Sequence, residues 1–154
     1  MYKFRKRRSS NNHNRRNNMK FCSINIGGMS EKSRFLLDKH VNDEQYDMVF
    51  VQETGTTDIE RLRLHGMTTL CDSNNAKNRG VSFYLKDEHS CSEIPEITSI
   101  TDNLDTVWAL VVVGNTRYIV GNLYLEHHYE DAISDVMAMV KPNHNVESYK
   151  RLEY

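Results

Sequence analysis

The sequence predicts a mixed α/β domain in which helices pack on a sheet, and three observations lead to this fold class. Strand-like apolar runs flank a helical pattern in the first third of the chain. Several further strand-like runs follow, two of them joined by a tight turn. A second helical pattern comes after them. Elements in this order are typical of a layered α/β domain.

The first third of the chain predicts two strands separated by a helix. We expect strands over residues 20–26 and 48–52, the second being almost wholly apolar. Ser30 is a good N-cap for a helix over residues 31–42. The apolar stripe expected for this helix comprises Phe35, Leu36, Leu37 and Val41.

The middle of the chain predicts short elements and loops. Thr57 or Asp58 can cap a helical turn that contains Ile59, Leu62 and Leu64. Strands are expected over residues 67–71 and 81–85, and residues 86–95 are expected to form a loop.

The last predicted elements are a hairpin and a helix. Residues 106–113 contain the only Trp and form a strongly β-prone run. Gly114-Asn115 fits a two-residue turn into a partner strand over 116–125. An amphipathic pattern then predicts a helix over 129–140, which Pro142 ends.

Charge is distributed unevenly, which divides the chain into an arm, a body and a tail. Residues 1–20 hold eight of the 20 basic residues and no acid, so residues 21–154 hold 12 basic and 21 acidic residues, a net charge of −9. We therefore expect a disordered basic arm over 1–18, one domain over 19–141 and a polar tail over 142–154. The cluster in residues 3–8 fits a nuclear-localisation or nucleic-acid patch, and the alternative is an upstream extension without a role.

Bulk properties place the chain in an intracellular compartment. Its three cysteines, Cys22, Cys71 and Cys91, are widely spaced and contain no Cys-x-x-Cys pair. This argues against a disulfide framework or a structural zinc site. No apolar run reaches the ~20 residues of a membrane span, and we expect no membrane partner.

Polar side chains follow three of the expected strands at the points where they end. Asn25 and a glycine turn follow the first strand, Glu53 follows the second, and Tyr124 lies near the end of the hairpin. If these three ends converge, they bring an amide, a carboxylate and a phenol to one face. A carboxylate at such an edge can hold a hard divalent cation. For any one of these residues alone, a solvated strand end is the more common explanation.

The ordered set of motifs resembles the endonuclease/exonuclease/phosphatase superfamily, and most of all the apurinic-endonuclease-like domain of non-LTR retrotransposons. The matching segments follow the family's order over residues 19–140. They are Ile24-Asn25-Ile26-Gly27-Gly28, the Asp47 to Thr54 stretch that ends in Gln-Glu-Thr, Arg79-Gly80-Val81, and Gly121-Asn122-Leu123-Tyr124.

The resemblance implies a DNase I-like sandwich of two sheets with helices on the outer faces. It also implies a Mg²⁺- or Mn²⁺-dependent phosphodiesterase that acts on DNA. Asn25, Glu53 and Tyr124 would be the catalytic residues. Glu53 and Asn25 would form the metal site, in which Glu53 is the ligand and Asn25 helps to orient the metal site and the phosphate. Tyr124 would contact the scissile phosphate.

The chain also departs from the family pattern. Leu125-Glu126-His127-His128 stands where the family has a Pro-Asn pair after its tyrosine. The family's later Gly-Asp-x-Asn motif and its Asp-His pair, which activates water, have no match. We therefore expect a truncated, N-terminal half of the domain that is inactive alone and self-associates. His127 and His128 could substitute as phosphate or metal contacts, although solvated loop residues are the favoured reading.

Three further residues or pairs are weaker candidates. Trp108 is expected in the core, although an aromatic ring at a rim can stack on a base. Asp102 and Asp105 are read as turn formers. Arg79 is read equally as a phosphate contact or as a solvated loop cation.

Two other functions remain open from the sequence. One is a phosphatase of the same superfamily that acts on inositol phosphates or lipids. The other is a non-enzymatic nucleic-acid-binding relic that uses the basic arm, whose affinity would fall steeply with salt.

Overall fold

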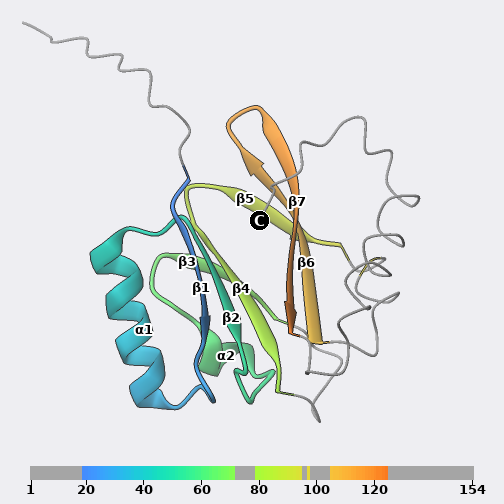
Figure 1. The fold of residues 1–154 in the computed structure, drawn as a ribbon. Helices are drawn as coiled ribbons and strands as arrows, with labels where there is room; N and C mark the ends of the chain where they lie inside the picture. The colour runs from blue at the N-terminus through green and yellow to red at the C-terminus, as the bar shows by residue number, and fades with distance from the viewer. Residues whose placement is uncertain (1–18, 72–78, 95–96, 98–104, 125–154) are drawn as a thin grey trace, which may run out of the picture.

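The computed structural model describes residues 19–71, 79–94, 97 and 105–124, which form two β-sheets and two helices (Figure 1). The four-stranded sheet has the order β1-β2-β4-β3, and the three-stranded sheet has the order β5-β6-β7. The expected helix over 129–140 and the expected arm and tail lie outside the described residues.

The four-stranded sheet is built around two apolar strands. β1 (Phe21–Asn25) pairs in parallel with β2 (Met48–Gln52), and β2 pairs antiparallel with β4 (Val81–Lys86). β3 (Met67–Cys71) pairs antiparallel with the other side of β4. A parallel neighbour needs a crossover connection, and helix α1 (Glu31–Glu44) supplies it between β1 and β2.

Helix α1 (Glu31–Glu44) begins where the sequence predicts, because the Ser30 side chain accepts a hydrogen bond from the Ser33 N–H and caps the helix. It ends at Gln45, which adopts a left-handed conformation. Its buried residues are Leu37 and Val41. The expected apolar stripe is wrong in part, because Phe35 and Leu36 are 68% and 54% exposed.

The three-stranded sheet contains the predicted hairpin and one strand that was not expected. β6 (Asp105–Val113) and β7 (Thr116–Tyr124) pair along their whole length around the Gly114-Asn115 turn. β5 (Ser90–Glu93) pairs with β6, so the expectation of a loop over 86–95 is wrong there. Its short polar sequence carries no strand pattern, and pairing with β6 decides its conformation.

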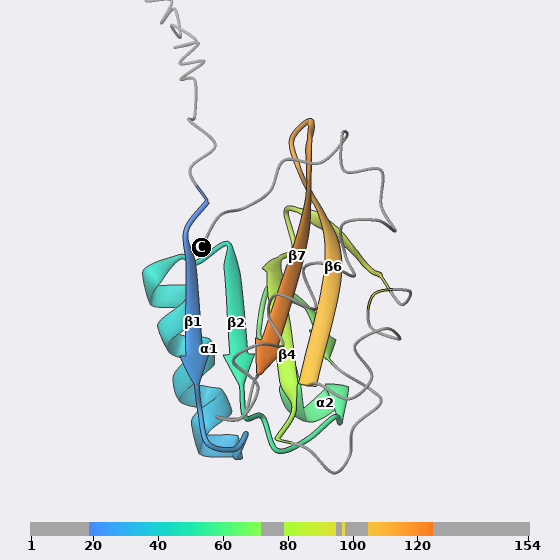
Figure 2. The same cartoon turned by 45° about the vertical axis from the view of Figure 1, so that its right-hand side comes forward.

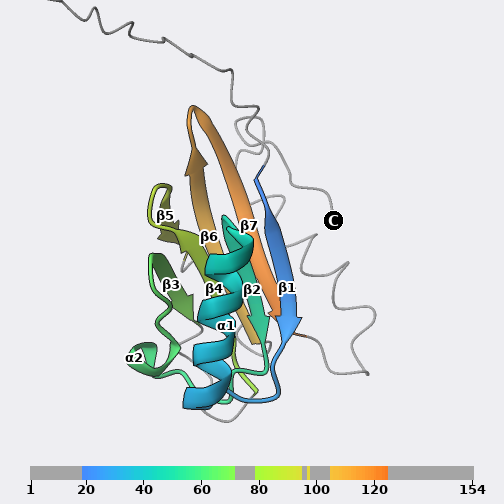
Figure 3. The same cartoon turned by 90° about the vertical axis from the view of Figure 1, so that its left-hand side faces the viewer.

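The two sheets pack face to face, and helices cover the outer face of the four-stranded sheet (Figures 2 and 3). Alternate residues of β2 face the two sides: Val49 and Val51 pack toward the helices, while Met48 packs between the sheets. α2 (Ile59–Leu62), capped by Asp58, contributes the fully buried Leu62 to the helical side.

The core between the sheets overturns one expectation. Because the family's second half has no match in the chain, we expect an apolar sheet face to be uncovered, formed in part by Phe83, Val111, Val113 and Ile119. Phe83, Val111 and Val113 are instead buried between the sheets, because the hairpin folds over β4. Ile119 lies partly buried on the other face of the hairpin with Trp108, whose predicted core position is confirmed.

A buried amide joins the two sheets near the ends of their strands. The Asn122 Nδ2 group donates to the carbonyl oxygens of Val51 (3.0 Å) and Ser82 (2.8 Å). Its Oδ1 atom accepts a hydrogen bond from Gln52 Nε2 at 2.8 Å. Asn122 is 3% exposed, so these bonds are shielded from water and fix β7 across β2 and β4.

Neither described helix is long and apolar enough to cross a membrane.

Candidate functional site

Glu53 directly follows β2 and has an unusual backbone conformation. Its φ angle is +54°, in the left-handed region that residues other than glycine seldom adopt. Such a conformation costs about 1–3 kcal/mol and persists where the surrounding structure holds it.

Main-chain hydrogen bonds hold this turn from both sides. Gly28 N–H donates to the Glu53 carbonyl at 2.7 Å, and Met29 N–H donates to the Thr54 carbonyl at 2.7 Å. On the other side, Thr54 N–H donates to the Gly80 carbonyl at 3.1 Å, and Gly55 N–H donates to the Arg79 carbonyl at 2.6 Å. The loops that follow β1 and precede β4 therefore fix the position of Glu53.

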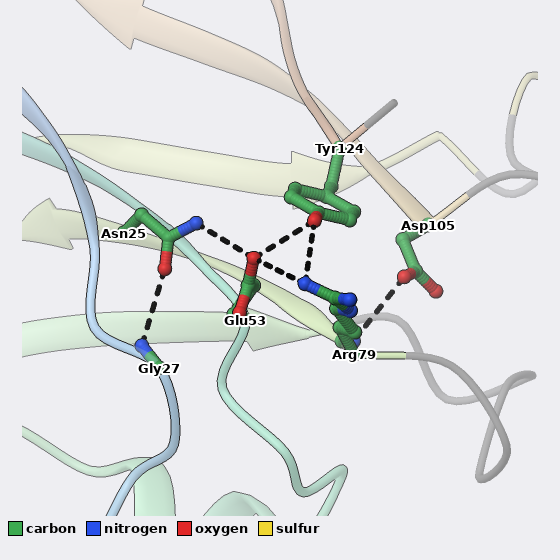
Figure 4. Close-up of polar contacts among 7 residues, drawn as sticks. Asn25, Gly27, Glu53, Arg79, Asp105 and Tyr124 are labelled. Carbon is green, nitrogen blue, oxygen red and sulfur yellow. Dashed lines mark hydrogen bonds and ion pairs between the residues drawn. The ribbon is translucent and has the colours of Figure 1, made fainter. Parts of the chain in front are cut away.

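The predicted convergence of Asn25, Glu53 and Tyr124 is confirmed (Figure 4). Asn25 Nδ2 donates to Glu53 Oε1 at 2.9 Å, and the Tyr124 hydroxyl donates to the same oxygen at 2.8 Å. Asn25 comes from β1 and Tyr124 from β7, so both sheets contribute to this cluster. The catalytic roles of the three residues, and the metal-binding roles of Glu53 and Asn25, stay predictions.

Arg79 is a fourth member of the cluster. Its NH1 atom lies 2.8 Å from Glu53 Oε1 and 3.0 Å from the Tyr124 hydroxyl. The following residue, Gly80, has a φ of +75°, and a Cβ added there would lie 2.5 Å from Thr54 Oγ1. Glycine at this position therefore lets the Arg79 loop approach the Glu53 turn closely.

These contacts keep the Glu53 carboxylate ionised. Hydrogen bonds from Asn25, Tyr124 and Arg79, in that order of importance, lower the pKa of Glu53 from 4.5 to about 2. All three donors use Oε1, and among the described residues no donor contacts Oε2. The side chain is 20% exposed, so a ligand from solvent can reach the carboxylate, and Oε2 is the oxygen that has no donor among the described residues.

Glu53 fits one position in the coordination shell of a hard divalent cation. Mg²⁺ commonly takes one or two carboxylates and keeps several waters, so a single fixed carboxylate oxygen is a suitable partner. Asn25 Oδ1 already accepts a hydrogen bond from Gly27 N–H at 3.1 Å, and its Nδ2 group faces Glu53. Asn25 thus orients the carboxylate directly and has one carbonyl lone pair left for a metal or its water.

A separate group of possible metal ligands lies at the other end of β2. Asp47, Glu88 and His89 place one ligand atom each within 4.8 Å of one another. Asp47 precedes β2 and Glu53 follows it, so the length of the strand, roughly 17 Å, separates the two places. This group already has partners, since Lys86 Nζ lies 3.4 Å from Glu88 and Lys20 N–H donates to Asp47 at 2.7 Å.

From the sequence alone, the role of Arg79 is open, Asn122 has no role of its own and Asp105 is placed in a turn. Asp105 is wrongly read as a turn former: it begins β6, is 5% exposed and accepts a hydrogen bond from Gly80 N–H at 3.3 Å. In the antiparallel pairing, Val81 lies opposite Gln52, which brings the residues before β4 beside Glu53. If the apolar runs over residues 48–52 and 81–86 had been predicted to pair antiparallel, that pairing would have placed Arg79 beside Glu53. Asp102, His127 and His128 lie outside the described residues.

The fold is similar to that of the endonuclease domain of TRAS1, a telomere-specific non-LTR retrotransposon. The TM-score is 0.64 at 9% sequence identity, over 87% of this chain and 57% of that chain. TDP2 from D. rerio complexed with single strand DNA product is also similar, with a TM-score of 0.58 at 13% identity, over 80% of this chain and 55% of that chain. A humanized D. rerio TDP2 with 14 mutations gives a TM-score of 0.56 at 13% identity, over 79% of this chain and 54% of that chain.

No protein-family model matches the sequence, and no curated protein matches it. The structural likeness shows the fold, a DNase I-like α/β sandwich, as the sequence resemblance implied. The chain spans between 54% and 57% of the length of these three solved structures.

Proposed function

We propose that this chain is part of a divalent-metal-dependent phosphodiesterase that acts on DNA as an endonuclease, and that this part alone does not cleave. The observation that carries the proposal is the Glu53 carboxylate, whose Oε1 accepts hydrogen bonds from Asn25, Arg79 and Tyr124 and whose Oε2 accepts none from the described residues. The similar solved structures support DNA as the substrate class, since they include a retrotransposon endonuclease domain and TDP2 with a single-stranded DNA product.

The residues of the cluster suit the charge of a phosphodiester. Mg²⁺ or Mn²⁺ bound at Glu53 would supply charge neutralisation of the phosphate and polarisation of a water. Glu53 Oε2 would hold the ion, and Asn25 would keep the carboxylate in one orientation. The Tyr124 hydroxyl, 2.8 Å from Glu53 Oε1, would donate to a phosphate oxygen that arrives beside the carboxylate.

Hydrolysis also needs a base that takes a proton from water, and this requirement motivates the second part of the proposal. General-base help is worth ~10²–10⁴-fold in rate. The histidines in the described part of the chain are His40, His65 and His89, and none of them contacts Glu53, Asn25 or Tyr124. We therefore expect cleavage to require residues beyond those of this cluster.

A nicking assay on supercoiled plasmid with Mg²⁺ tests the activity. We expect no nicking by the chain alone. Nicking by the wild type that disappears in Glu53→Gln would overturn the proposed inactivity and establish a complete enzyme.

A titration with Mn²⁺ tests the metal site separately. Calorimetry should show weak binding that is lost in Glu53→Gln, because that substitution removes the open carboxylate oxygen. Glu60→Gln is a matched control, since it removes the same charge from an exposed ion pair with Arg63. Equal binding by Glu53→Gln and the wild type would exclude Glu53 as the ligand.

Three further features belong to the proposal. An intracellular location, and a nuclear one if the basic cluster over residues 3–8 acts as a signal, fits the absence of paired cysteine motifs. Self-association is supported by exposed apolar side chains on β1 and α1, namely Phe21, Phe35 and Leu36. Two alternative functions have their own signatures. A phosphatase of the same superfamily would release phosphate in the absence of DNA. A nucleic-acid-binding role of the basic arm would show as salt-sensitive DNA binding that needs residues 1–18.

A further inference from the structure

The Arg79 guanidinium lies where it compensates the charge of Glu53. Its NH1 atom donates to both Glu53 Oε1 and the Tyr124 hydroxyl, and its CZ atom lies 5.7 Å from the centre of the Tyr124 ring (Figure 4). The Glu53–Arg79 pair therefore has no net charge. Because a guanidinium is protonated at every accessible pH, this compensation is always present.

A divalent cation at Glu53 Oε2 would meet this guanidinium at close range. Both oxygens belong to one carboxylate, so the ion and the guanidinium would lie only a few ångströms apart. Like charges at that distance repel even in a water-like medium, and the effect on affinity is on the order of tenfold. Arg79 in its present position consequently weakens the binding of the metal.

The Arg79 side chain is more exposed than that of Glu53, while its main chain is held in place. Its main chain is fixed by the hydrogen bond from Gly55 N–H to the Arg79 carbonyl, at 2.6 Å. Its side chain is 55% exposed, whereas that of Glu53 is only 20% exposed. A phosphodiester that enters beside Glu53 offers the guanidinium two anionic oxygens in a geometry that it binds well.

We infer that Arg79 couples metal binding to phosphodiester binding: without a phosphodiester it pairs with Glu53 and disfavours the metal, and with one it moves to the phosphate and leaves the carboxylate to the ion. This inference rests on the proposed function and adds a phosphate-binding residue to it. By linkage, each ligand then tightens the binding of the other.

Calorimetric titration of Mn²⁺, with and without a thymidine dinucleotide that contains one phosphodiester, tests the coupling. For the wild type we expect the dinucleotide to tighten Mn²⁺ binding by roughly tenfold. For Arg79→Ala we expect Mn²⁺ alone to bind roughly tenfold more tightly than it binds to the wild type, with little further effect of the dinucleotide. Arg79→Lys keeps the charge and should keep weak binding of Mn²⁺ alone.

A gain of affinity on truncation separates this role from structural damage, which lowers affinity. Arg117→Ala is the charge-matched control, because Arg117 is exposed on β7 opposite Val112, at the far end of the strand from Tyr124. It should bind Mn²⁺ like the wild type. Circular dichroism melting of each variant checks that the fold is kept.

The outcomes distinguish this inference from the function on which it rests. If Glu53→Gln weakens Mn²⁺ binding but Arg79→Ala leaves it unchanged or weaker, the coupling is overturned and the metal site stands. If Glu53→Gln leaves Mn²⁺ binding unchanged, both the metal site and the coupling are overturned.

Discussion

Glu53 combines an unusual backbone conformation with a carboxylate that accepts three hydrogen bonds on one oxygen. The φ of +54° is maintained by main-chain hydrogen bonds to the loops on both sides. This strain aims the side chain at the space between β1 and β7, where Asn25 and Tyr124 reach it. A rigid carboxylate costs less to order when it binds a ligand, which is the physical advantage of the arrangement.

The lowered pKa of Glu53 predicts how its contribution to stability varies with pH. The carboxyl pKa falls from 4.5 to about 2 on folding, because the ionised form gains the bonds from Asn25, Tyr124 and Arg79. The stabilisation is therefore fully present well above pH 4.5 and is lost as the pH falls toward 2. Urea unfolding gives the free energy of unfolding of the wild type and of Glu53→Gln at each pH. The difference between the two proteins should be constant near neutral pH and should shrink below pH 4.5. A difference that stays constant into the acidic range would contradict the assignment.

At the scale of elements, α1 has more apolar residues in its sequence pattern than it buries against the rest of the protein. Leu37 is 4% exposed and packs on β2, whereas Leu36 is 54% exposed. The helix rotates by about 100° per residue, so the Leu36 side chain points well away from the direction in which Leu37 is buried.

Two leucine truncations in α1 test this packing with the same chemical change. Leu37→Ala should lower the free energy of unfolding by about 2–5 kcal/mol through a lost buried side chain and a cavity. Leu36→Ala should change it by no more than about 0.5 kcal/mol, because its side chain already meets solvent. Chemical denaturation of both variants measures the difference, and equal losses would show that α1 is packed in another orientation.

The junction between the sheets depends on the buried amide of Asn122. Asn122→Ala leaves the carbonyls of Val51 and Ser82 and the Gln52 amide without their partner. Since each buried group left unsatisfied costs about 1–3 kcal/mol, we expect a loss of at least about 2 kcal/mol in the free energy of unfolding. Asn42→Ala, which removes an exposed amide from α1, should stay within about 0.5 kcal/mol. A small effect at Asn122 would mean that the sheets hold together through their apolar faces alone.

At the scale of the whole molecule, the basic arm and the body are expected to act separately. Residues 1–20 hold eight basic residues and no acid, and this composition offers almost nothing to bury. A chain that starts at Met19 should therefore keep the thermal midpoint of the full chain. If the arm contacts DNA, the same deletion should lower DNA affinity and flatten its dependence on salt. A large drop in the midpoint would show that the arm packs on the body.

The sequence alone determined the elements whose pattern is local. The capped helix after Ser30, the apolar strand before Glu53 and the Gly114-Asn115 hairpin follow from caps, periodicity and turn chemistry, which act over a few residues. Ordered motifs at strand ends also sufficed to predict that Asn25, Glu53 and Tyr124 meet.

Only the tertiary structure decided the rest. Arg79 joins the site because β4 runs antiparallel to β2, Phe83 and Val111 are buried because one sheet folds over the other, and β5 is a strand because β6 lies beside it. Each of these depends on which strands pair across long separations, and local propensity carries no information about that choice.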